Sequence, residues 1–410
     1  MTDPAMTNKV LLVTSVMWAT AARLAAAFAD CGWRIDVLAP PGHAAGKSRH
    51  LGTFHPYQPW GPQFILQRVI ETAEPDLIVP CDDRALRQLL ALRAITAETA
   101  GTLARSLGET RTYPILLSRS QSLEAGRALG IAVPLTIAVS NPQALEQAVA
   151  ETGFPAAIKL DGSWGDDGIV IANDVAEARA AFRKLSHLAS PLGKAVRALR
   201  RRDAGYWWDI LQPGPTGICV QRVIAGHNAT CSVAAWNGDV VGALCADVVA
   251  ARGSFGPPSV LRTTDAPDMI DAACEIAAKF GLSGLHGLEF IRGEDGSLYL
   301  TEITPYATQN AHLALGPERD LIAALTRAAT GNSCPARPAV ADRDLIALFP
   351  QEWLRDAQSP YLHQAYHDAP WEDTAVLDAI VARAEAATPF PRDTAPVLIL
   401  DEPEIEKPAQ

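Results

Sequence analysis

The sequence contains few cysteines, and none of them form a recognisable pair. Seven cysteines are scattered over 410 residues without a CxxC motif or a regular spacing. This pattern argues against a zinc site and a disulfide framework, and it predicts reduced thiols in a cytoplasmic protein. Four of them lie in apolar, strand-like runs, where we expect core packing: Cys81, Cys219, Cys231 and Cys245.

Basic charge and long apolar runs are also scarce. The chain has 35 Lys and Arg against 46 Asp and Glu, a formal net charge of -11. Nucleic-acid binding depends on a basic surface, so no nucleic-acid partner is expected. No apolar stretch reaches the roughly 18 residues of a membrane span, so no membrane association is expected. The apolar run after Lys9 continues into a helical pattern with Arg23 and Asp30, which favours a first β-strand over a signal peptide.

Two common nucleotide-binding motifs are missing. The first predicted strand is followed by "VTSVMWA", which contains no GxGxxG, so a dinucleotide fold of the usual kind is unsupported. The segment "PGHAAGKS" ends in Gly-Lys-Ser, but only three residues separate Gly42 from Gly46, where a P-loop needs four. Neither segment therefore predicts a phosphate site.

The residues that are present predict α/β and α+β architecture. The runs "KVLLVTS", "WATAARLAAAFADCG" and "WRIDVLAP" read as strand, helix and strand, and this unit predicts a parallel sheet within an N-terminal α/β domain over residues 1–112. A second region with helices and hairpins follows over 113–334. Residues 335–410, rich in Pro, Trp and Tyr, are expected to form a small C-terminal extension.

Two hairpins are predicted in the second region. The first turns at Asn237-Gly238-Asp239 between two apolar runs. The second is "LHGLEFIRGEDGSLYLTEITPY", and pairing Gly293 with Leu298 would place Glu289 directly opposite Glu302. Like charges in that position are destabilising unless a cation lies between them, so the pair predicts half of a magnesium–nucleotide site. A register slip of one residue would send the two side chains to opposite faces.

A glycine-rich loop lies roughly 130 residues upstream of this hairpin. In "IKLDGSWGDDGIVI", Lys159 ends an apolar strand and is followed by Gly162, Gly165 and Gly168. Such a loop allows backbone N–H groups to surround phosphate oxygens, and a lysine beside it can pair with them. A simple surface turn is the alternative interpretation.

Taken in order, the lysine, the glycine loop and the paired glutamates resemble the ATP-grasp superfamily of carboxylate–amine ligases. The resemblance covers roughly residues 9–330. It implies a pre-ATP-grasp domain followed by a two-lobed ATP-grasp fold, with a flexible phosphate-covering lobe at about 140–225. It also implies ATP and Mg²⁺, with Mn²⁺ as a substitute, as cofactors.

The resemblance also assigns roles to residues. Lys159 and Arg119 match positions that contact ATP phosphates, and the glycines of the loop match the mobile phosphate-covering segment. The segment from Gln221 through Arg222 and Val223 to Ile224 matches the hinge that meets adenine. Glu289 and Glu302 match the two Mg²⁺-binding glutamates, and Thr304 stands where the superfamily has a third metal ligand, an asparagine.

One departure bears on the reaction. The superfamily usually has an arginine at the position of Tyr306, and tyrosine cannot supply a fixed cation. Arg262, in "ARGSFGPPSVLRTTDAP", is the candidate to replace it as a catalytic cation, and a surface arginine is the alternative.

The activity implied is an ATP-dependent ligation, in which a carboxylate is activated as an acyl phosphate and attacked by an amine, with ADP and phosphate released. The expected partners are small-molecule carboxylates and amines, and a homodimer is compatible with the sequence. One alternative is a protein that binds nucleotide without ligation. Another is an NAD-dependent oxidoreductase, which rests only on the N-terminal strand–helix–strand unit.

Three further features have a structural and a functional interpretation. The segment "GKAVRALRRRDAG" predicts a helix with a solvated basic face, and recruitment of an anionic substrate or carrier is the alternative. His286 and His312 flank the proposed site, and either can be a packing histidine.

Overall fold

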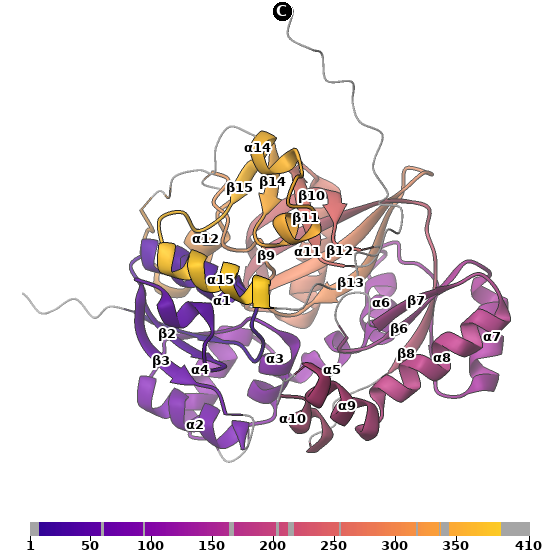
Figure 1. The fold of residues 1–410 in the computed structure, drawn as a ribbon, viewed down its shortest axis with the longest axis horizontal. Coiled ribbons are helices and arrows are strands. Elements are labelled where there is room, and N and C mark those ends of the chain that lie inside the picture. The colour runs from indigo at the N-terminus through magenta and orange to yellow at the C-terminus, as the bar shows by residue number, and fades with distance from the viewer. Residues whose placement is uncertain are drawn as a thin grey trace, which may run out of the picture.

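Three β-sheets organise the chain, and Figure 1 shows them side by side. The computed structural model describes residues 8–58, 61–92, 95–163, 168–201, 205–211, 217–253, 256–316, 319–335, 337 and 344–386. No helix within these ranges is long and apolar enough to cross a membrane.

The first sheet is parallel, as the sequence predicts, and has the strand order β3-β2-β1-β4. Its strands are β1 (Lys9–Val13), β2 (Arg34–Ala39), β3 (Leu51–Pro56) and β4 (Leu77–Pro80). The helices of this part are α1 (Thr20–Asp30), η1 (Ala44–Lys47), α2 (Pro62–Ala73), α3 (Asp83–Leu90), α4 (Ala97–Leu107), η2 (Thr110–Thr112) and α5 (Tyr113–Leu116). The apolar run after Lys9 forms a central strand, because β1 pairs with β2 on one side and with β4 on the other.

A small four-stranded sheet forms the second lobe, with all its pairings antiparallel in the order β5-β8-β6-β7. Its strands are β5 (Thr136–Val139), β6 (Ala156–Leu160), β7 (Ile169–Ala172) and β8 (Ile218–Arg222). The helices before and within this lobe are α6 (Arg119–Ala128), α7 (Pro142–Thr152), α8 (Val175–Ala189), α9 (Pro191–Arg201) and α10 (Gly205–Leu211). Helices α9 and α10 run back from the lobe toward the N-terminal domain (Figure 1).

The largest sheet has seven strands in the order β13-β12-β9-β10-β11-β14-β15. The strands are β9 (Gly226–Trp236), β10 (Asp239–Ala251), β11 (Pro258–Thr263), β12 (Gly284–Gly293), β13 (Leu298–Thr304), β14 (Leu345–Leu348) and β15 (Tyr366–Asp368), with helices α11 (Pro267–Phe280) and α12 (Leu321–Thr330). The predicted hairpin at Asn237 and Gly238 is confirmed, and both residues have the positive φ of a type I′ turn, 52° and 91°. Apolar clusters cover both faces of the sheet.

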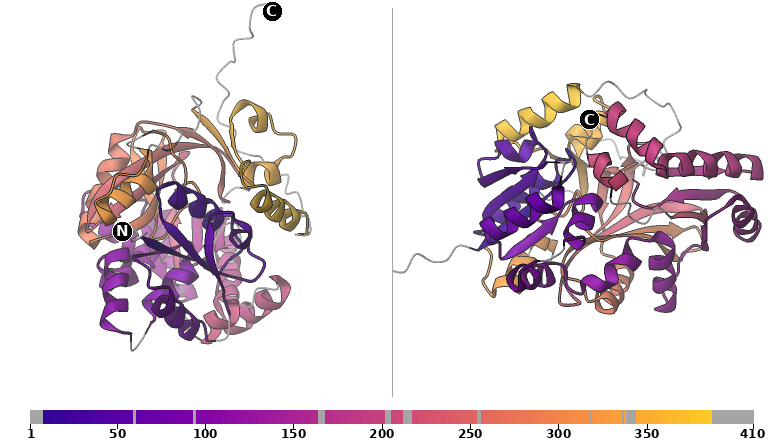
Figure 2. Two further views of the ribbon diagram at one scale, coloured as in Figure 1. Left: turned by 90° about the vertical axis from the view of Figure 1, so that its left-hand side faces the viewer. Right: turned by 90° about the horizontal axis from the view of Figure 1, so that it is seen from below.

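Residues from 345 onward continue the large sheet. Strand β14 pairs with β11, and β15 then pairs with β14 in parallel. Helices α13 (Gln351–Arg355), α14 (Tyr361–Gln364) and α15 (Thr374–Ala386) accompany them. Helix α15 packs against η1 of the N-terminal domain, and Figure 2 shows this yellow helix lying along the indigo domain. The last described helix therefore lies against the N-terminal domain.

One expectation about the cysteines is wrong. Cys31 and Cys334, which are 303 residues apart in the sequence, form a disulfide. The fold brings them together because α1 packs beside α12, and Trp33 donates a hydrogen bond to Thr326 Oγ1 on that helix at 2.9 Å. The four cysteines expected in the core are buried and unpaired, as predicted.

Candidate functional site

The predicted pair of glutamates is present in the β12–β13 hairpin. Glu289 lies directly opposite Glu302 in the antiparallel register, so both side chains occupy one face of the sheet. On its other side Glu289 is opposite Thr230 of β9, whose hydroxyl donates a hydrogen bond to Glu289 Oε1 at 3.2 Å. A carboxylate pair next to a hydroxyl is therefore built into the sheet.

The register arises differently from the prediction. Leu298 pairs with Arg292 and not with Gly293, which alone would have shifted the glutamates out of alignment. A β-bulge at Thr301 adds one residue to β13 and restores the alignment. The Thr301 hydroxyl donates to the Glu289 carbonyl at 3.1 Å, which fixes the bulge beside the pair.

Arg119 supplies positive charge to the site from the first turn of α6. It is 7% exposed, and its guanidinium donates to Glu302 Oε1 at 2.7 Å and lies 3.8 Å from Asp161 Oδ1. Burial alone would lower the pKa of Arg119, but the neighbouring carboxylates raise it above its usual value, so it stays charged. Glu302 therefore already has a cationic partner, whereas Glu289 has only a hydroxyl.

The lack of a neighbouring cation is reflected in the pKa of Glu289. Burial, followed by the charge of Glu302, raises the pKa of Glu289 to about 8, although the Thr230 hydrogen bond opposes the change. Within the described chain no cluster of three or more His, Cys, Asp or Glu side chains could enclose a metal. Two carboxylates without a protein cage suit Mg²⁺, which usually takes one or two carboxylates together with waters and substrate phosphates. The residues therefore fit a magnesium ion shared with a nucleotide.

Lys159 and the glycine loop border the same site. Lys159 lies near the end of β6, and burial, followed by the charge of Arg119, lowers the pKa of Lys159 to about 8. Gly162 has a φ of 64°, a backbone conformation that favours glycine. A Cβ on Gly168 would lie 1.7 Å from Ser163 Oγ, so this position has no room for a side chain. Gly165 lies outside the described residues.

The predicted hinge segment connects the two lobes. Gln221 is buried at the end of β8 and donates to Thr136 Oγ1 at 3.1 Å, while the Arg222 guanidinium turns away to the Thr152 carbonyl at 3.0 Å. Val223 and Ile224 are half-buried in the connection between β8 and β9. The Arg222 side chain is therefore held by α7.

Arg119, Glu302 and the start of the glycine loop border a pocket of about 420 Å³, part of it open to solvent. Glu289, Lys159 and the hinge segment do not line this pocket. Four of the predicted ATP- and metal-binding residues contribute to its wall, namely Arg119, Gly162, Glu302 and Thr304. The other lining residues are Asp83, Leu116, Leu117, Ser122, Asp161, Ser163, Ile303, Pro305 and Tyr306. Sequence reasoning missed Asp83 and Asp161 as site residues. Asp161 directly follows the strand of Lys159 and precedes Gly162, a position that could have identified it.

Arg262 is not brought into this pocket. It pairs with Asp247, which pairs with Ala229 and in turn with Phe290, so Arg262 lies on the face opposite Glu289. Three strand spacings, roughly 14 Å, also separate β11 from β12. The geometry therefore gives no support to Arg262 as a replacement for the missing arginine.

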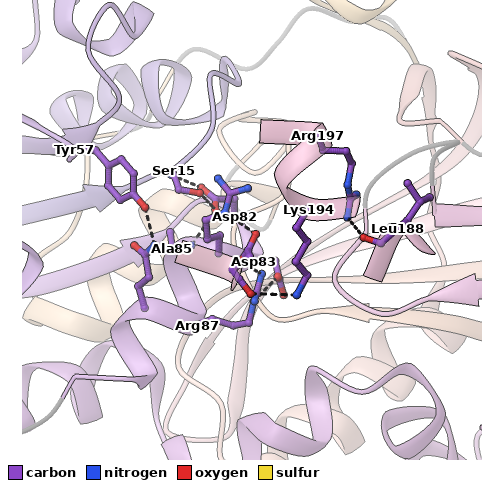
Figure 3. Close-up of polar contacts among 12 residues, drawn as sticks. Ser15, Tyr57, Asp82, Asp83, Ala85, Arg87, Leu188, Lys194 and Arg197 are labelled. Carbon is purple, nitrogen blue, oxygen red and sulfur yellow. Dashed lines mark hydrogen bonds and ion pairs between the residues drawn. The ribbon is translucent and has the colours of Figure 1, made fainter. Parts of the chain in front are cut away.

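The basic segment on α9 is partly structural. The Lys194 ammonium is buried and donates to the Asp209 carbonyl at 3.1 Å, and the Arg197 guanidinium donates to the Leu188 carbonyl at 2.7 Å (Figure 3). Arg200 is exposed, in agreement with a solvated face, and Arg202 lies outside the described residues.

The two histidines also have packing roles. His286 interacts through Nε2 with the Ser283 carbonyl at 2.9 Å. His312 interacts through Nε2 with Asp368 Oδ2 at 2.9 Å, and the same aspartate pairs with Arg23 of α1. Neither histidine lines the pocket.

Comparison with known proteins gives similarity in structure alone. No protein-family model matches the sequence, and no curated protein matches it. N5-carboxyaminoimidazole synthetase from Staphylococcus aureus superposes with a TM-score of 0.56 at 13% identity, covering 80% of this chain and 78% of that one. Biotin carboxylase from Campylobacter jejuni gives 0.57 at 14% identity, with 81% and 73% covered.

A third structure is the biotin carboxylase domain of 2-oxoglutarate carboxylase from Hydrogenobacter thermophilus, solved with MgADP, ADP and bicarbonate. It superposes with a TM-score of 0.58 at 14% identity, covering 81% of this chain and 71% of that one. Identities this low establish a common fold only. The ATP-grasp architecture that the sequence predicts is thus confirmed, with a parallel N-terminal sheet followed by antiparallel sheets.

Proposed function

We propose that the protein is an ADP-forming ATP-grasp ligase that activates a carboxylate as an acyl phosphate for attack by an amine. The observation that carries this proposal is the convergence of Arg119, Glu302 and Gly162 on one pocket. Glu289 stands opposite Glu302 in the hairpin, and Lys159 borders the glycine loop. ATP and small-molecule carboxylates and amines are the proposed ligands.

Each residue has a defined contribution. Glu289 and Glu302, with Thr304 beside them, would hold Mg²⁺, or Mn²⁺ in its place, and this cation would offset charge on the phosphates. Arg119 stays charged at any physiological pH and would bind phosphate oxygens from inside the pocket. Lys159 would pair with the same phosphates, and the loop from Gly162 to Gly168 would cover them and exclude water.

The Val223–Ile224 connection would meet the base of the nucleotide. The side chain of Gln221 is already bonded to Thr136 and that of Arg222 to the α7 carbonyls, so the backbone is the part of this segment left for adenine. Arg262 is not part of the proposed machinery, because it lies on the other face of the sheet.

Calorimetric titration of a slowly hydrolysed ATP analogue with Mg²⁺ tests the nucleotide site. The parent protein is compared with a Glu289→Gln, Glu302→Gln double variant, and Glu294→Gln in the exposed loop of the same hairpin is the matched control. We expect metal-dependent binding in the parent and the control and its loss in the double variant. If the parent binds no nucleotide, the ligase proposal is wrong.

A protein that binds nucleotide without ligation is the second candidate. The observation in its favour is that Tyr306 lines the pocket at the position of the expected arginine, while Arg262 lies too far away to replace it. Hydroxylamine converts acyl phosphates to hydroxamates, so ATP-dependent hydroxamate formation across a carboxylate panel separates the two candidates. Nucleotide binding without hydroxamate or ADP formation would favour the second.

Cellular location and assembly remain predictions. The scattered cysteines without a CxxC motif predict a cytoplasmic protein, but the Cys31–Cys334 disulfide counts against this prediction because such bonds are rare in reducing compartments. A homodimer is the assembly to test, by light scattering of the purified protein.

A further inference from the structure

The side of the pocket formed by the N-terminal domain has a distinct chemistry. It brings together Asp83 from the start of α3, Leu116 and Leu117 at the end of α5, and Pro305 and Tyr306 after β13. This wall combines one carboxylate, one phenol and three apolar side chains. None of the five can offer a positive charge to a ligand.

The carboxylate of Asp83 is buried and only partly neutralised. Its side chain accepts a hydrogen bond from Arg87 Nε at 2.7 Å, and the residue is 6% exposed. Arg87 is shared, because its other nitrogen lies 3.2 Å from Asp209 Oδ1 on α10 (Figure 3). Burial raises the pKa of Asp83, and the charge of Arg87 opposes this effect. A carboxylate has about four acceptor positions, so further donors can be accommodated.

Tyr306 faces the same negative charge. Burial, followed by the charges of Asp83 and Glu302, raises the pKa of its hydroxyl well above the usual value. A neutral phenol can accept a hydrogen bond from a cation, and its ring face attracts one.

Arg119 lies in the wall of the same pocket and carries an unused donor. The residue is 7% exposed, and its Nε has no hydrogen-bond partner among the residues that the structure describes. A buried donor without a partner is costly, so Nε is the nitrogen of Arg119 left to bind a further acceptor. The pocket therefore presents a donor for an anionic group and, on the Asp83 wall, acceptors for a cationic one.

The formal charges of the lining residues also favour a cationic group at the Asp83 wall. Three carboxylates line the pocket, Asp83, Asp161 and Glu302, against the single guanidinium of Arg119. Arg119 is within 3.8 Å of two of them, so Asp83 is the carboxylate that Arg119 does not reach by any recorded contact. Arg87, the cation paired with Asp83, is shared with Asp209, so a second anionic group on a substrate would meet a carboxylate that is only partly neutralised, which low dielectric makes unfavourable.

From this geometry we infer that the substrate carries a primary ammonium group, which Asp83 and Tyr306 hold at the N-terminal wall while its anionic end approaches Arg119. This inference rests on the proposed function and specifies its substrate class. Leu116, Leu117 and Pro305 would contact a short apolar chain between the two charged ends. The ammonium is bound in its protonated form, and the bound state requires Asp83 to be ionised.

Matched ligands test this substrate class. ω-Amino carboxylates and dicarboxylates of equal chain length, such as 4-aminobutyrate and succinate, differ in whether the second end is an ammonium or a carboxylate. Each is titrated by calorimetry into the full-length protein saturated with Mg²⁺ and the ATP analogue. We expect the amino series to bind and the dicarboxylates of the same length to bind at least tenfold more weakly. Tighter binding of the dicarboxylates would overturn the inference.

Variants locate the effect. Asp83→Asn should weaken binding of the amino series by roughly tenfold to a hundredfold, the range expected for a hydrogen bond to a charged group. Tyr306→Arg should invert the preference, because it places a guanidinium beside Asp83. Asp265→Asn, at a side chain that is 96% exposed, is the matched control and should change nothing. An unchanged preference in both pocket variants would refute the assignment.

The nucleotide titration keeps this test separate from that of the proposed function. If the parent protein and Asp83→Asn bind the ATP analogue equally while the amino series fails to bind, only the substrate class is wrong. If neither protein binds the analogue, the proposed function itself fails.

Discussion

Gly287 provides a sharp test of how the site is packed. It lies on β12 two residues before Glu289, opposite Thr304 on β13. A Cβ at Gly287 would be 2.4 Å from Thr308 Cγ2, closer than two carbon atoms can approach. Thr308 in turn is hydrogen-bonded to Ser232 at 2.8 Å, so it cannot move away without losing that contact.

The expected cost of Gly287→Ala follows from these contacts. Overpacking a tight interior typically costs about 1–3 kcal/mol, and losing the Ser232 hydrogen bond alone costs about 1 kcal/mol. Thr308→Ala removes the colliding methyl group, so the double variant should cost about 1 kcal/mol, much less than the sum of the two single changes.

Urea denaturation of the four proteins measures this coupling from the midpoints at constant m-value. Gly101→Ala is the control, because Gly101 lies inside α4 and a Cβ there would meet Arg105 Nη1 at 3.8 Å, an ordinary contact distance. Alanine at this position should stabilise the helix by about 0.5–1 kcal/mol. Additive effects in the double variant, or a Gly287→Ala protein as stable as Gly101→Ala, would refute the packing argument.

Three further predictions concern titration and cross-linking. Burial lowers the pKa of His286 from 6.5 to about 4, so between these pH values the imidazole is protonated in the unfolded chain and neutral in the folded one. The free energy of unfolding should therefore fall as the pH decreases from 6.5 to 4, by about 1.4 kcal/mol per pH unit. His286→Gln should remove this part of the pH dependence in urea titrations. Lys159 and Glu289 both have a pKa of about 8 and lose a proton over the same pH range, with opposite effects on binding of the ATP analogue with Mg²⁺. The affinity of the parent relative to that of Lys159→Arg, which stays charged, should therefore fall by up to about tenfold between pH 7 and 9. The Cys31–Cys334 disulfide spans 303 residues, and the loop-closure entropy it removes from the unfolded chain stabilises the fold by about 5–6 kcal/mol. A reductant should therefore lower the melting temperature of the parent and leave that of a Cys31→Ser, Cys334→Ser variant unchanged.

Local patterns were sufficient to predict much of the fold. Apolar runs of strand length, separated by a helical period, predicted the parallel N-terminal sheet, and Asn237-Gly238 predicted a tight hairpin turn. Both features depend on residues adjacent in the sequence, where steric preference and hydrophobic periodicity act directly. Local patterns do not determine on which face of β13 the Glu302 side chain lies, because that face depends on every residue between the turn and Glu302.

The β12–β13 hairpin illustrates this limit. The predicted alignment of Glu289 with Glu302 is correct, but it results from two departures that compensate each other, a loop longer by one residue and a bulge at Thr301. No composition signal at Thr301 distinguishes a bulge from regular pairing. Without the bulge the same loop would have turned one carboxylate to the other face, because side chains alternate along a strand.

Long-range pairings could not be predicted at all. Cys31 and Cys334 meet because α1 packs on α12, and Arg262 faces away from Glu289 because of the register across β10 and β9, the two strands between β11 and β12. Asp83 belongs to the same category: it follows a strand of the N-terminal domain, and nothing local indicates that it faces a loop some 80 residues later. Such contacts are decided by the order of strands in the sheets and by how the domains pack.

The site is consequently assembled from parts that are held together independently. Glu289 and Glu302 belong to the large sheet, Arg119 to the helix that leads into the small lobe, and Asp83 to the N-terminal domain. The small lobe is joined to the N-terminal domain by a charge cluster in which Asp209 of α10 contacts both Arg84 and Arg87 of α3. Because Arg87 also holds Asp83, a movement of α10 would change the charge that Asp83 presents to the pocket. Closure of the small lobe over a nucleotide and recognition of an ammonium group at Asp83 would therefore be coupled through a single arginine.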